Sequence, residues 1–371
     1  MPAINRVFAS RAKWIVLFGI LFAVLIPATD VRCEDGSPTQ APVVYVHYDY
    51  MAGYDPTLGA YVSFAPPAAA IDSVIRSFRS HGVILHVDPR HAVIPYHEVV
   101  VPDWDPAWQH VTTSCEGGDA VSFAALKAAY FHPRDDHAWH YGIFVHNGGL
   151  PDTGDGSACP PDPLCGAYPD PLGSGVSELP GLNFMVALGA DVDQGFSISQ
   201  ERWAGTFMHE LGHNFGLMHG GIYPYPQDCL AFKPNYVSVM GYLYQNGIAY
   251  SNDGNPALPG TGVRIDYSDE MLPTLNEYDL DEQAGVGASL HPADLIEFYS
   301  ASRFATAFAS GPIDWNLDGT TSGPHVAVDL DNDNGTPNQS LSGFDDWDYI
   351  HQFIRRPDYQ AGRARGATSV E

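Results

Sequence analysis

Residues 209–219 read HELGHNFGLMH, a stretch that sets three histidines and one carboxylate at a fixed spacing. On a helix of ~3.6 residues per turn, His209 and His213 lie on one face, one turn apart, so both imidazoles can bind a single metal ion. Glu210 adjoins the first histidine without being a ligand, which is the position that a general base requires. The spacing predicts two metal ligands and a catalytic carboxylate on one helix.

The third histidine of the stretch follows a glycine. Gly216 lets the chain leave the helix through a left-handed or otherwise strained turn, after which His219 can return as a third ligand. Three neutral imidazoles leave the fourth tetrahedral position to water, which distinguishes catalytic zinc sites from closed structural ones. The stretch therefore predicts one catalytic zinc ion bound by His209, His213 and His219.

The residues before this stretch favour a helix independently. Ser197 and Gln200 form an S-x-x-Q capping box. An apolar stripe follows, made of Ala204, Phe207, Met208 and Leu211. Together they predict an amphipathic helix of about five turns that carries the zinc ligands.

Residues 233–242 read KPNYVSVMGY, with a methionine inside a compact apolar turn and a tyrosine two residues later. With the elongated histidine motif, this stretch resembles the metzincin clan of metallopeptidases, and the likeness looks closest to secreted bacterial members. The resemblance covers about residues 43–347. It implies that Met240 forms the floor of the zinc site and that Tyr242 lies near the zinc and helps to stabilise the oxyanion. Gly220 is not a residue that marks the named families, so the family within the clan stays open.

The rest of the chain indicates a mixed architecture. Strand-like runs occur at Val43–Tyr48, Val83–Val87, Tyr141–Val145 and Phe184–Leu188. Helix-like runs occur at Ala68–Ser80 and Ala120–Tyr130, with one more near His291–Phe308. Interleaved strands and helices predict an α/β (α+β) metzincin-like fold with a mixed twisted sheet. We expect an upper catalytic subdomain over 34–219, an irregular lower subdomain over 220–310, an acidic region over 311–358 and a flexible tail over 359–371.

A strand beside the zinc also suggests how substrate binds. If Asn183–Ala190 lies at the edge of the sheet above the zinc, an extended peptide can add to it as a further strand. Backbone hydrogen bonds would then orient the scissile carbonyl largely independently of the peptide's sequence. Pattern and the clan resemblance together support this hypothesis.

Two acidic stretches are typical of calcium loops. DWNLDG at 314–319 and DLDND at 329–333 place oxygen-bearing side chains at alternate positions. The candidate ligands are Asp314, Asn316, Asp318, Asp329, Asp331 and Asp333. Neither stretch is a complete EF-hand, because the twelfth position is His325 in one and Ser340 in the other. Structural calcium sites and solvated acidic turns both remain open readings.

The first 33 residues are typical of a secretory signal. Three basic residues precede an apolar run over 14–26, which is shorter than the ~20 residues of a membrane span. Cleavage after residue 28 or after Cys33 fits equally well, and Cys33 also faintly resembles a latency cysteine that would occupy the open zinc position. Export predicts disulfides among Cys115, Cys159, Cys165 and Cys229. We favour Cys159 with Cys165 and Cys115 with Cys229, although three pairings are possible.

The overall charge narrows the possible partners. The chain has 44 acidic against 17 basic residues, a formal net charge of −27. Such a balance disfavours nucleic acid and anionic membranes, so we expect contact with a membrane only through the signal segment. The expected partner is a peptide or protein substrate, and the expected state is a monomer.

These observations predict a secreted zinc-dependent endopeptidase that hydrolyses peptide bonds with a zinc-activated water and Glu210 as general base. One alternative is a binding or adhesion module that keeps the metzincin fold but is catalytically silent. The intact Glu210 argues against it, because a silent site has no need of that carboxylate. A second alternative is a peptidase specific for glycoproteins, which the sequence does not distinguish from a general endopeptidase.

Overall fold

The computed structural model describes residues 41–104, 120–133, 137–148, 174–222, 230–251, 262–300, 303–321, 325–331, 337 and 339–360. The predicted signal segment, all five cysteines, Asp333 and the tail from residue 361 lie outside these described residues. The chain divides into a unit of Met1–Gln40 and a unit of Ala41–Glu371. Among the helices of the described residues, none has the length and apolar character needed to cross a membrane.

A mixed sheet is built around the long strand β1 (Val43–Asp55). On one side β1 pairs with antiparallel β2 (Ala60–Ser63) and with parallel β3 (Ile84–Val87) and β4 (Val93–Pro95). On the other side it pairs in parallel with β7 (Trp139–Val145). The order continues through parallel β10 (Asn183–Ala187) to antiparallel β9 (Gly175–Ser177). The four predicted strands and the mixed α/β class are confirmed.

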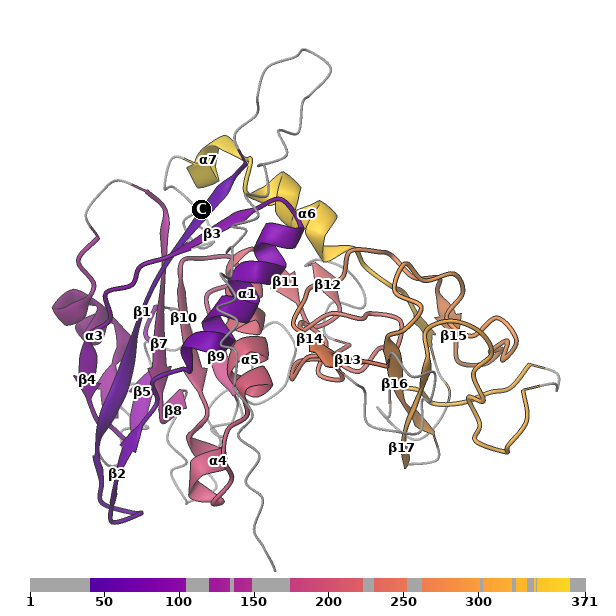
Figure 1. Ribbon diagram of the computed structural model, residues 1–371, viewed down its shortest axis with the longest axis horizontal. Coiled ribbons are helices and arrows are strands. Elements are labelled where there is room, and N and C mark those ends of the chain that lie inside the picture. Colours follow the sequence, from indigo (N-terminus) through magenta and orange to yellow (C-terminus); the bar gives the residue numbers. More distant parts are fainter. Residues whose placement is uncertain are drawn as a thin grey trace, which may run out of the picture. The chain divides into compact units, whose positions relative to one another are not determined.

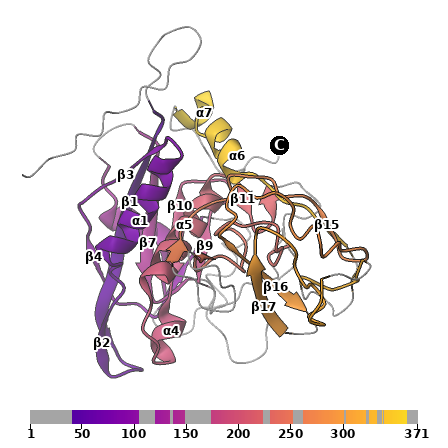
Figure 2. The same ribbon diagram turned by 45° about the vertical axis from the view of Figure 1, so that its right-hand side comes forward.

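Two helices cover this sheet on the side of the predicted zinc motif. The predicted helix Ala68–Ser80 is confirmed as α1, and it buries Ile71, Val74 and Phe78. Helix α5 (Gln200–Asn214) contacts α1, β9 and β10. Both views show α1 and α5 side by side along the strands (Figure 1, Figure 2). The histidine motif is thus presented from a helix that is held on several sides.

The predicted helix Ala120–Tyr130 is correct only in its second part. Residues Ala120–Ser122 form β6, which pairs with β5 (Val99–Val101), and the helix α3 spans Phe123–Tyr130. The side chain of Ser122 accepts the backbone N–H of Ala125 at 3.2 Å, which fixes the start of the helix. β5 also pairs with β8 (Asn147–Gly148), and the short helix α4 (Gly189–Asp193) follows β10.

The chain after α5 is built mainly from short strand pairs. They are β11 (Leu217–Met218) with β12 (Gly221–Ile222), β13 (Ile248–Tyr250) with β14 (Gly262–Arg264), β15 (Leu275–Asn276) with β18 (Ser340–Leu341), and β16 (Leu295–Ser300) with β17 (Arg303–Phe308). The helix predicted near His291–Phe308 is wrong, because this segment is the β16–β17 pair. In β16 buried and partly buried residues alternate and aromatic and β-branched types are frequent, which favours a strand.

Two hydrophobic clusters hold the described residues together. The larger one joins the sheet, α1 and α5 to the helices α6 (Asp346–Phe353) and α7 (Pro357–Gln360). The smaller one surrounds the fully buried Trp315 and includes Phe298, Leu330 and Leu341. Residues 314–319 and 329–331 of the acidic stretches therefore border a core of their own.

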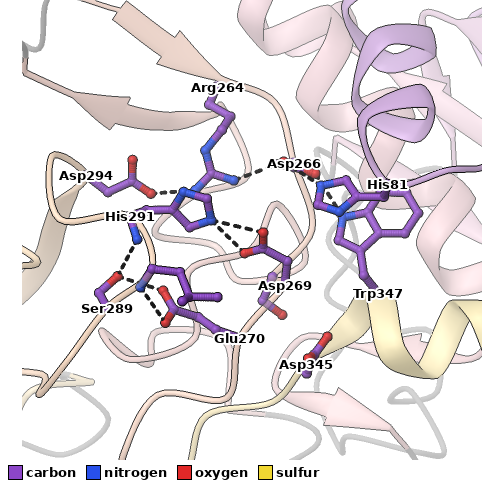
Figure 3. A network of polar contacts seen from close by, with 12 residues as sticks. His81, Arg264, Asp266, Asp269, Glu270, Ser289, His291, Asp294, Asp345 and Trp347 are labelled. Atoms are coloured by element: carbon purple, nitrogen blue, oxygen red, sulfur yellow. Dashed lines mark hydrogen bonds and ion pairs between the residues drawn. The ribbon is translucent and has the colours of Figure 1, made fainter. Parts of the chain in front are cut away.

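A polar network connects α1, α6 and the segment after β14 (Figure 3). Asp266 accepts hydrogen bonds from Trp347 at 3.0 Å and from Ser77 at 2.7 Å, and lies 3.1 Å from His81 Nε2. The rings of His81 and Trp347 stack with centroids 4.4 Å apart. Burial raises the pKa of Asp266, but His81, Arg264 and Ser77 lower it by more. These contacts join the segment around Trp347 to the end of α1 and to the segment after β14.

Candidate metal centre

The helix that carries the motif starts at a different cap from the predicted one. The side chain of Ser199 accepts the backbone N–H of Arg202 at 3.2 Å, and α5 begins at Gln200. The predicted capping box of Ser197 and Gln200 is therefore wrong, because the hydroxyl nearest to the orphan amides of the first turn is that of Ser199. The helix has 15 residues, which is about four turns rather than five.

The first two histidines are oriented by backbone carbonyls. Nδ1 of His209 lies 2.7 Å from the carbonyl oxygen of Val239, and Nδ1 of His213 lies 2.7 Å from that of Leu217. A carbonyl can only accept, so each Nδ1 carries the ring proton and each Nε2 presents a lone pair. Such bonds are the usual means of orienting metal-binding histidines.

The two Nε2 atoms lie 3.1 Å apart. With both ring protons on Nδ1, two lone pairs face each other at this distance, and they repel unless a cation is shared between them. Nitrogens that share a tetrahedral zinc at ~2.0–2.1 Å are separated by roughly 3.3 Å. The donor set and its spacing therefore fit a zinc ion.

His219 completes the cluster from the β11–β12 pair. Gly216 has a φ of +96°, the left-handed conformation expected of it, and Leu217 and Met218 then lead the chain back. The ring of His219 lies 5.3 Å from that of His209 and 5.0 Å from that of His213, between centroids. One ligand atom from each of the three histidines lies within 4.8 Å of the others.

The environment keeps the ligands neutral. Burial, and next the neighbouring His213, lower the pKa of His209 to about 3, although the bond to Val239 raises it. Burial also moves the pKa of His219 well below its ordinary value. Neutral imidazole is the form that binds a metal ion, so the site holds these two ligands ready for binding.

Glu210 is buried beside the cluster, with 3% of its surface exposed. Burial raises the pKa of Glu210 to about 8, although a hydrogen bond from Ser177 lowers it. The Ser177 hydroxyl lies 2.6 Å from Oε2 and 2.9 Å from the backbone oxygen of Glu210. A Cβ atom at Gly175 would overlap the Glu210 carboxyl group and the backbone oxygen of Met185. The edge strand β9 thus positions the Glu210 carboxylate in two ways. The Ser177 hydroxyl donates a hydrogen bond to it, and the absence of a side chain at Gly175 leaves room for it.

Met240 and Tyr242 both lie close to the histidine cluster. Met240 is fully buried, and a Cβ atom at Gly212 would overlap its Sδ, so the methionine packs directly under the helix between the two histidines. The ring of Tyr242 lies 4.5 Å from that of His219 and 6.1 Å from that of His209, between centroids. Tyr242 is 42% exposed, so this side of the histidine cluster reaches the surface.

Two buried ionisable residues, Lys233 and Asp346, hold the turn at residues 233–242 in place. Neither was predicted from the sequence. Asp346 of α6 accepts the Tyr236 hydroxyl at 2.7 Å and the Ser238 hydroxyl at 2.5 Å. Lys233 Nζ donates to the backbone oxygen of Gly220 at 2.6 Å and to that of Ser342 at 2.7 Å. Lys233 therefore holds the backbone directly after His219. The contacts join residues more than ten positions apart, so no local spacing signals them.

The two acidic stretches differ in whether their carboxylates come close to other acidic side chains. Asp329 and Asp331 converge with Glu277, which the sequence reading did not include. Asp314 accepts the backbone N–H groups of Asp318 and Gly319, and Asn316 accepts that of Asp318. In the described part of the chain, the 314–319 stretch joins no cluster of three acidic or histidine side chains. Its calcium site stays a prediction.

Comparison with known proteins points to the same segment. The model of the Peptidase M66 family matches residues 188–231, which contain α5 and the three histidines. The match supports a metallopeptidase of the metzincin-like kind. No curated protein matches the chain.

Two solved structures are similar over about half of the chain. The archaemetzincin of Methanopyrus kandleri is 16% identical over 47% of this chain and 75% of its own, with a TM-score of 0.26. The archaemetzincin of Archaeoglobus fulgidus, complexed with malonate, is 13% identical over 48% of this chain and 80% of its own, with a TM-score of 0.21.

Proposed function

We propose that the protein is a secreted zinc-dependent endopeptidase. The observation that carries the proposal is the cluster of His209, His213 and His219, with two ring protons fixed by backbone carbonyls and with Glu210 buried beside it. Zinc held there would lower the pKa of a water molecule and polarise the substrate carbonyl. Export is part of the proposal and rests on the charged and then apolar pattern of residues 1–33.

Glu210 is the proposed general base. Its carboxylate takes the proton from the attacking water and later gives it to the leaving amine. Burial makes the ionised carboxylate a stronger base than an exposed one, which favours the transfer of a proton from water. Ser177 keeps the carboxyl group in one orientation through its hydrogen bond.

Tyr242 is the proposed oxyanion donor. Its ring lies beside His219 and is partly exposed, so its hydroxyl can approach a substrate carbonyl that develops negative charge. Met240 has no role in the chemistry. It supports the helix from below and keeps the two helical histidines in place.

The prediction that substrate adds to the strand at Asn183–Ala190 is wrong. This strand, β10, does not lie at the edge of the sheet, because β9 pairs with its outer side. Glu178 N and Ser174 O bond to β10, so in an antiparallel ladder Gly175 and Ser177 direct their backbone groups away from it. We propose that an extended peptide pairs with β9 instead. N-methylation of substrate amides at alternate positions should raise KM by roughly threefold to tenfold per lost bond. An unchanged KM at every position would exclude this binding mode.

The test compares the purified protein with Glu210→Gln on a mixed peptide library, and cleavage is read by mass spectrometry. The variant should keep one zinc ion per chain by metal analysis but lose at least about 10⁴-fold in kcat, because the amide cannot take the proton. His213→Ala should instead lose the zinc ion. Chelator-sensitive cleavage that is absent from Glu210→Gln supports the peptidase.

The two other readings give different results in the same assay. A zinc-loaded protein that cuts neither bare peptides nor glycosylated proteins would be the silent binding module. Cleavage of glycosylated proteins alone would show a glycoprotein-specific peptidase. The buried Glu210 beside the cluster favours catalysis over silent binding, because an ion held only for structure has no use for that carboxylate.

A further inference from the structure

Three carboxylates from two separate segments converge far along the chain from the histidine cluster. Glu277 follows β15, and Asp329 and Asp331 lie between β17 and β18. One oxygen from each lies within 4.8 Å of the other two. Glu277 is fully buried, and Asp331 is 4% exposed. Three like charges at this distance in a buried place repel strongly.

Asp329 is the decisive member. Both of its carboxylate oxygens are buried, and neither has a hydrogen-bond partner. An ionised carboxylate without a partner costs several kcal/mol to bury. The fold thus supplies no hydrogen-bond donor to the carboxylate of Asp329.

Basic side chains are scarce in this region. Between Arg264 and Arg355 the only lysine or arginine in the sequence is Arg303, whose side chain is exposed. This stretch of the sequence therefore supplies little positive charge of its own, and Asp329 has no hydrogen-bond partner to balance its charge. A cation among the three carboxylates would supply that positive charge.

The cluster is held in a fixed arrangement by the backbone. Glu277 Oε1 accepts the N–H of Leu330 at 2.7 Å, and its Oε2 accepts the N–H of Gln339 at 3.2 Å. The Gln339 side-chain amide donates to Asp331. These contacts fix the positions of the Glu277 and Asp331 carboxylates.

A third cluster offers a useful contrast. Asp55, His146 and Asp193 also bring ligand atoms within 4.8 Å of one another. Asp55, however, accepts the N–H groups of Thr57 and Leu58 and the hydroxyl of Tyr96. Asp193 is 38% exposed in its side chain. Hydrogen-bond donors and solvent therefore compensate the charges of Asp55 and Asp193, and this cluster needs no ion.

We propose that Glu277, Asp329 and Asp331 bind one calcium ion that stabilises the fold. Hard carboxylate oxygens suit calcium, which tolerates flexible geometry and further oxygen ligands, better than they suit zinc. The ion would tie the end of β15 to the segment before β18, next to Leu330 and Leu341 of the smaller hydrophobic cluster. This site is independent of the zinc site and of peptidase activity.

The experiment uses the whole protein, stripped of metals and reloaded with one equivalent of zinc. Calcium is then added while thermal unfolding is followed, and its stoichiometry is measured by calorimetry. Saturating calcium should raise Tm on the order of 5 °C, with one ion per chain in this site. Magnesium should raise it less, because it demands a stricter octahedral geometry. A wild-type protein whose Tm ignores calcium, or responds equally to magnesium, would overturn the proposal.

Asp329→Asn and Asp318→Asn form a matched pair of variants. Asp329→Asn removes the unpartnered charge with little change of shape, so it should lose the calcium-induced rise in Tm and keep its zinc content. Without calcium it should be at least as stable as the wild type, because repulsion is relieved. Asp318→Asn, at an exposed position of the 314–319 stretch, should keep the rise. A rise that persists in Asp329→Asn and vanishes in Asp318→Asn would place the ion in the other stretch. If Asp329→Asn does not fold, Asp331→Asn and the wild-type stoichiometry decide the matter.

Discussion

The histidine cluster and the carboxylate cluster differ in the charge of their side chains and in how the surrounding protein compensates that charge. At the histidines, carbonyls of Val239 and Leu217 fix the ring protons, and burial keeps His209 and His219 neutral without an ion. At the carboxylates, Asp329 has no donor at all. The first cluster is prepared for its metal by neutral ligands, whereas the second leaves a charge that only a cation can balance.

This difference predicts different consequences of losing each metal. Neutral ligands repel one another far less than charged ones, so removal of zinc should abolish chemistry and leave much of the fold intact. Charged ligands repel one another without a cation, so loss of calcium should weaken the fold around the smaller hydrophobic cluster.

The largest effect should come from His219→Ala. Loss of the third ligand should abolish zinc binding and lower peptide cleavage by at least about 10⁴-fold, while the calcium-induced rise in Tm persists. Metal analysis, cleavage assays and thermal unfolding check the three parts. His325→Ala is the control, since this exposed histidine pairs at the surface with Asp279 and Asp281. If His219→Ala also lost the calcium response, the two sites would not be independent.

The next effect concerns the carboxylate beside the zinc. In Gly175→Ala the new methyl group would overlap the Glu210 carboxyl group and push it out of position. A displacement of about 1 Å can cost 10²-fold, so we expect kcat to fall by about that factor with zinc retained. Val176→Ala is the control, because its side chain projects to the other face of β9. Equal kcat values for the two variants would show that β9 does not position Glu210.

Almost all of the histidine site can be predicted from the sequence, because its residues lie on one helix and on the short segment that follows it. The offsets within residues 209–219 fix which side chains share a face, and Gly216 marks the turn. Gly175, Ser177 and Glu277 were missed for a physical reason. Each reaches its partner through contacts between segments far apart in the chain, and no periodicity encodes such contacts.

The fold shows the same limit. Strands β1, β7 and β10 follow from their apolar runs, but the pairing of β9 with β10 does not, because a strand of three residues leaves almost no pattern. The segment near His291–Phe308 was misjudged as a helix because its polar and apolar residues fit both periods over a short window. The start of α5 was misplaced because Ser197 and Ser199 both precede the helix, and only the backbone course selects between them.

A smaller effect is expected at the backbone beside His219. Lys233→Met keeps the apolar stem but leaves the oxygens of Gly220 and Ser342 without their charged donor. Loss of such an orienting contact should weaken zinc affinity by about 10-fold to 100-fold, measured by competition with a chelator. Lys127→Met is the matched control, because this lysine bonds to Asn183 and not to the turn. Similar zinc affinities in both variants would rule out the orienting role of Lys233.

The smallest effect concerns Asp346, a buried acid that has the donors Asp329 lacks. Burial raises the pKa of Asp346 to about 7, although hydrogen bonds from Ser238, Tyr236 and Ser268 lower it. The folded carboxyl group then keeps its proton up to about pH 7, while an unfolded aspartate loses it near pH ~4. Unfolding therefore releases a proton between these values, and the free energy of unfolding should fall as the pH rises through this window.

Asp346→Asn should remove this dependence, because the amide does not titrate. The slope between about pH 4 and pH 7 should flatten by at most ~1.4 kcal/mol per pH unit, measured by denaturant unfolding at a series of pH values. An unchanged slope would mean that Asp346 is ionised in the folded protein, balanced by its hydroxyl donors alone. Asp329 would then need a cation only because it has no such donors, which sharpens the contrast between a buried acid that is hydrogen-bonded and one that is not.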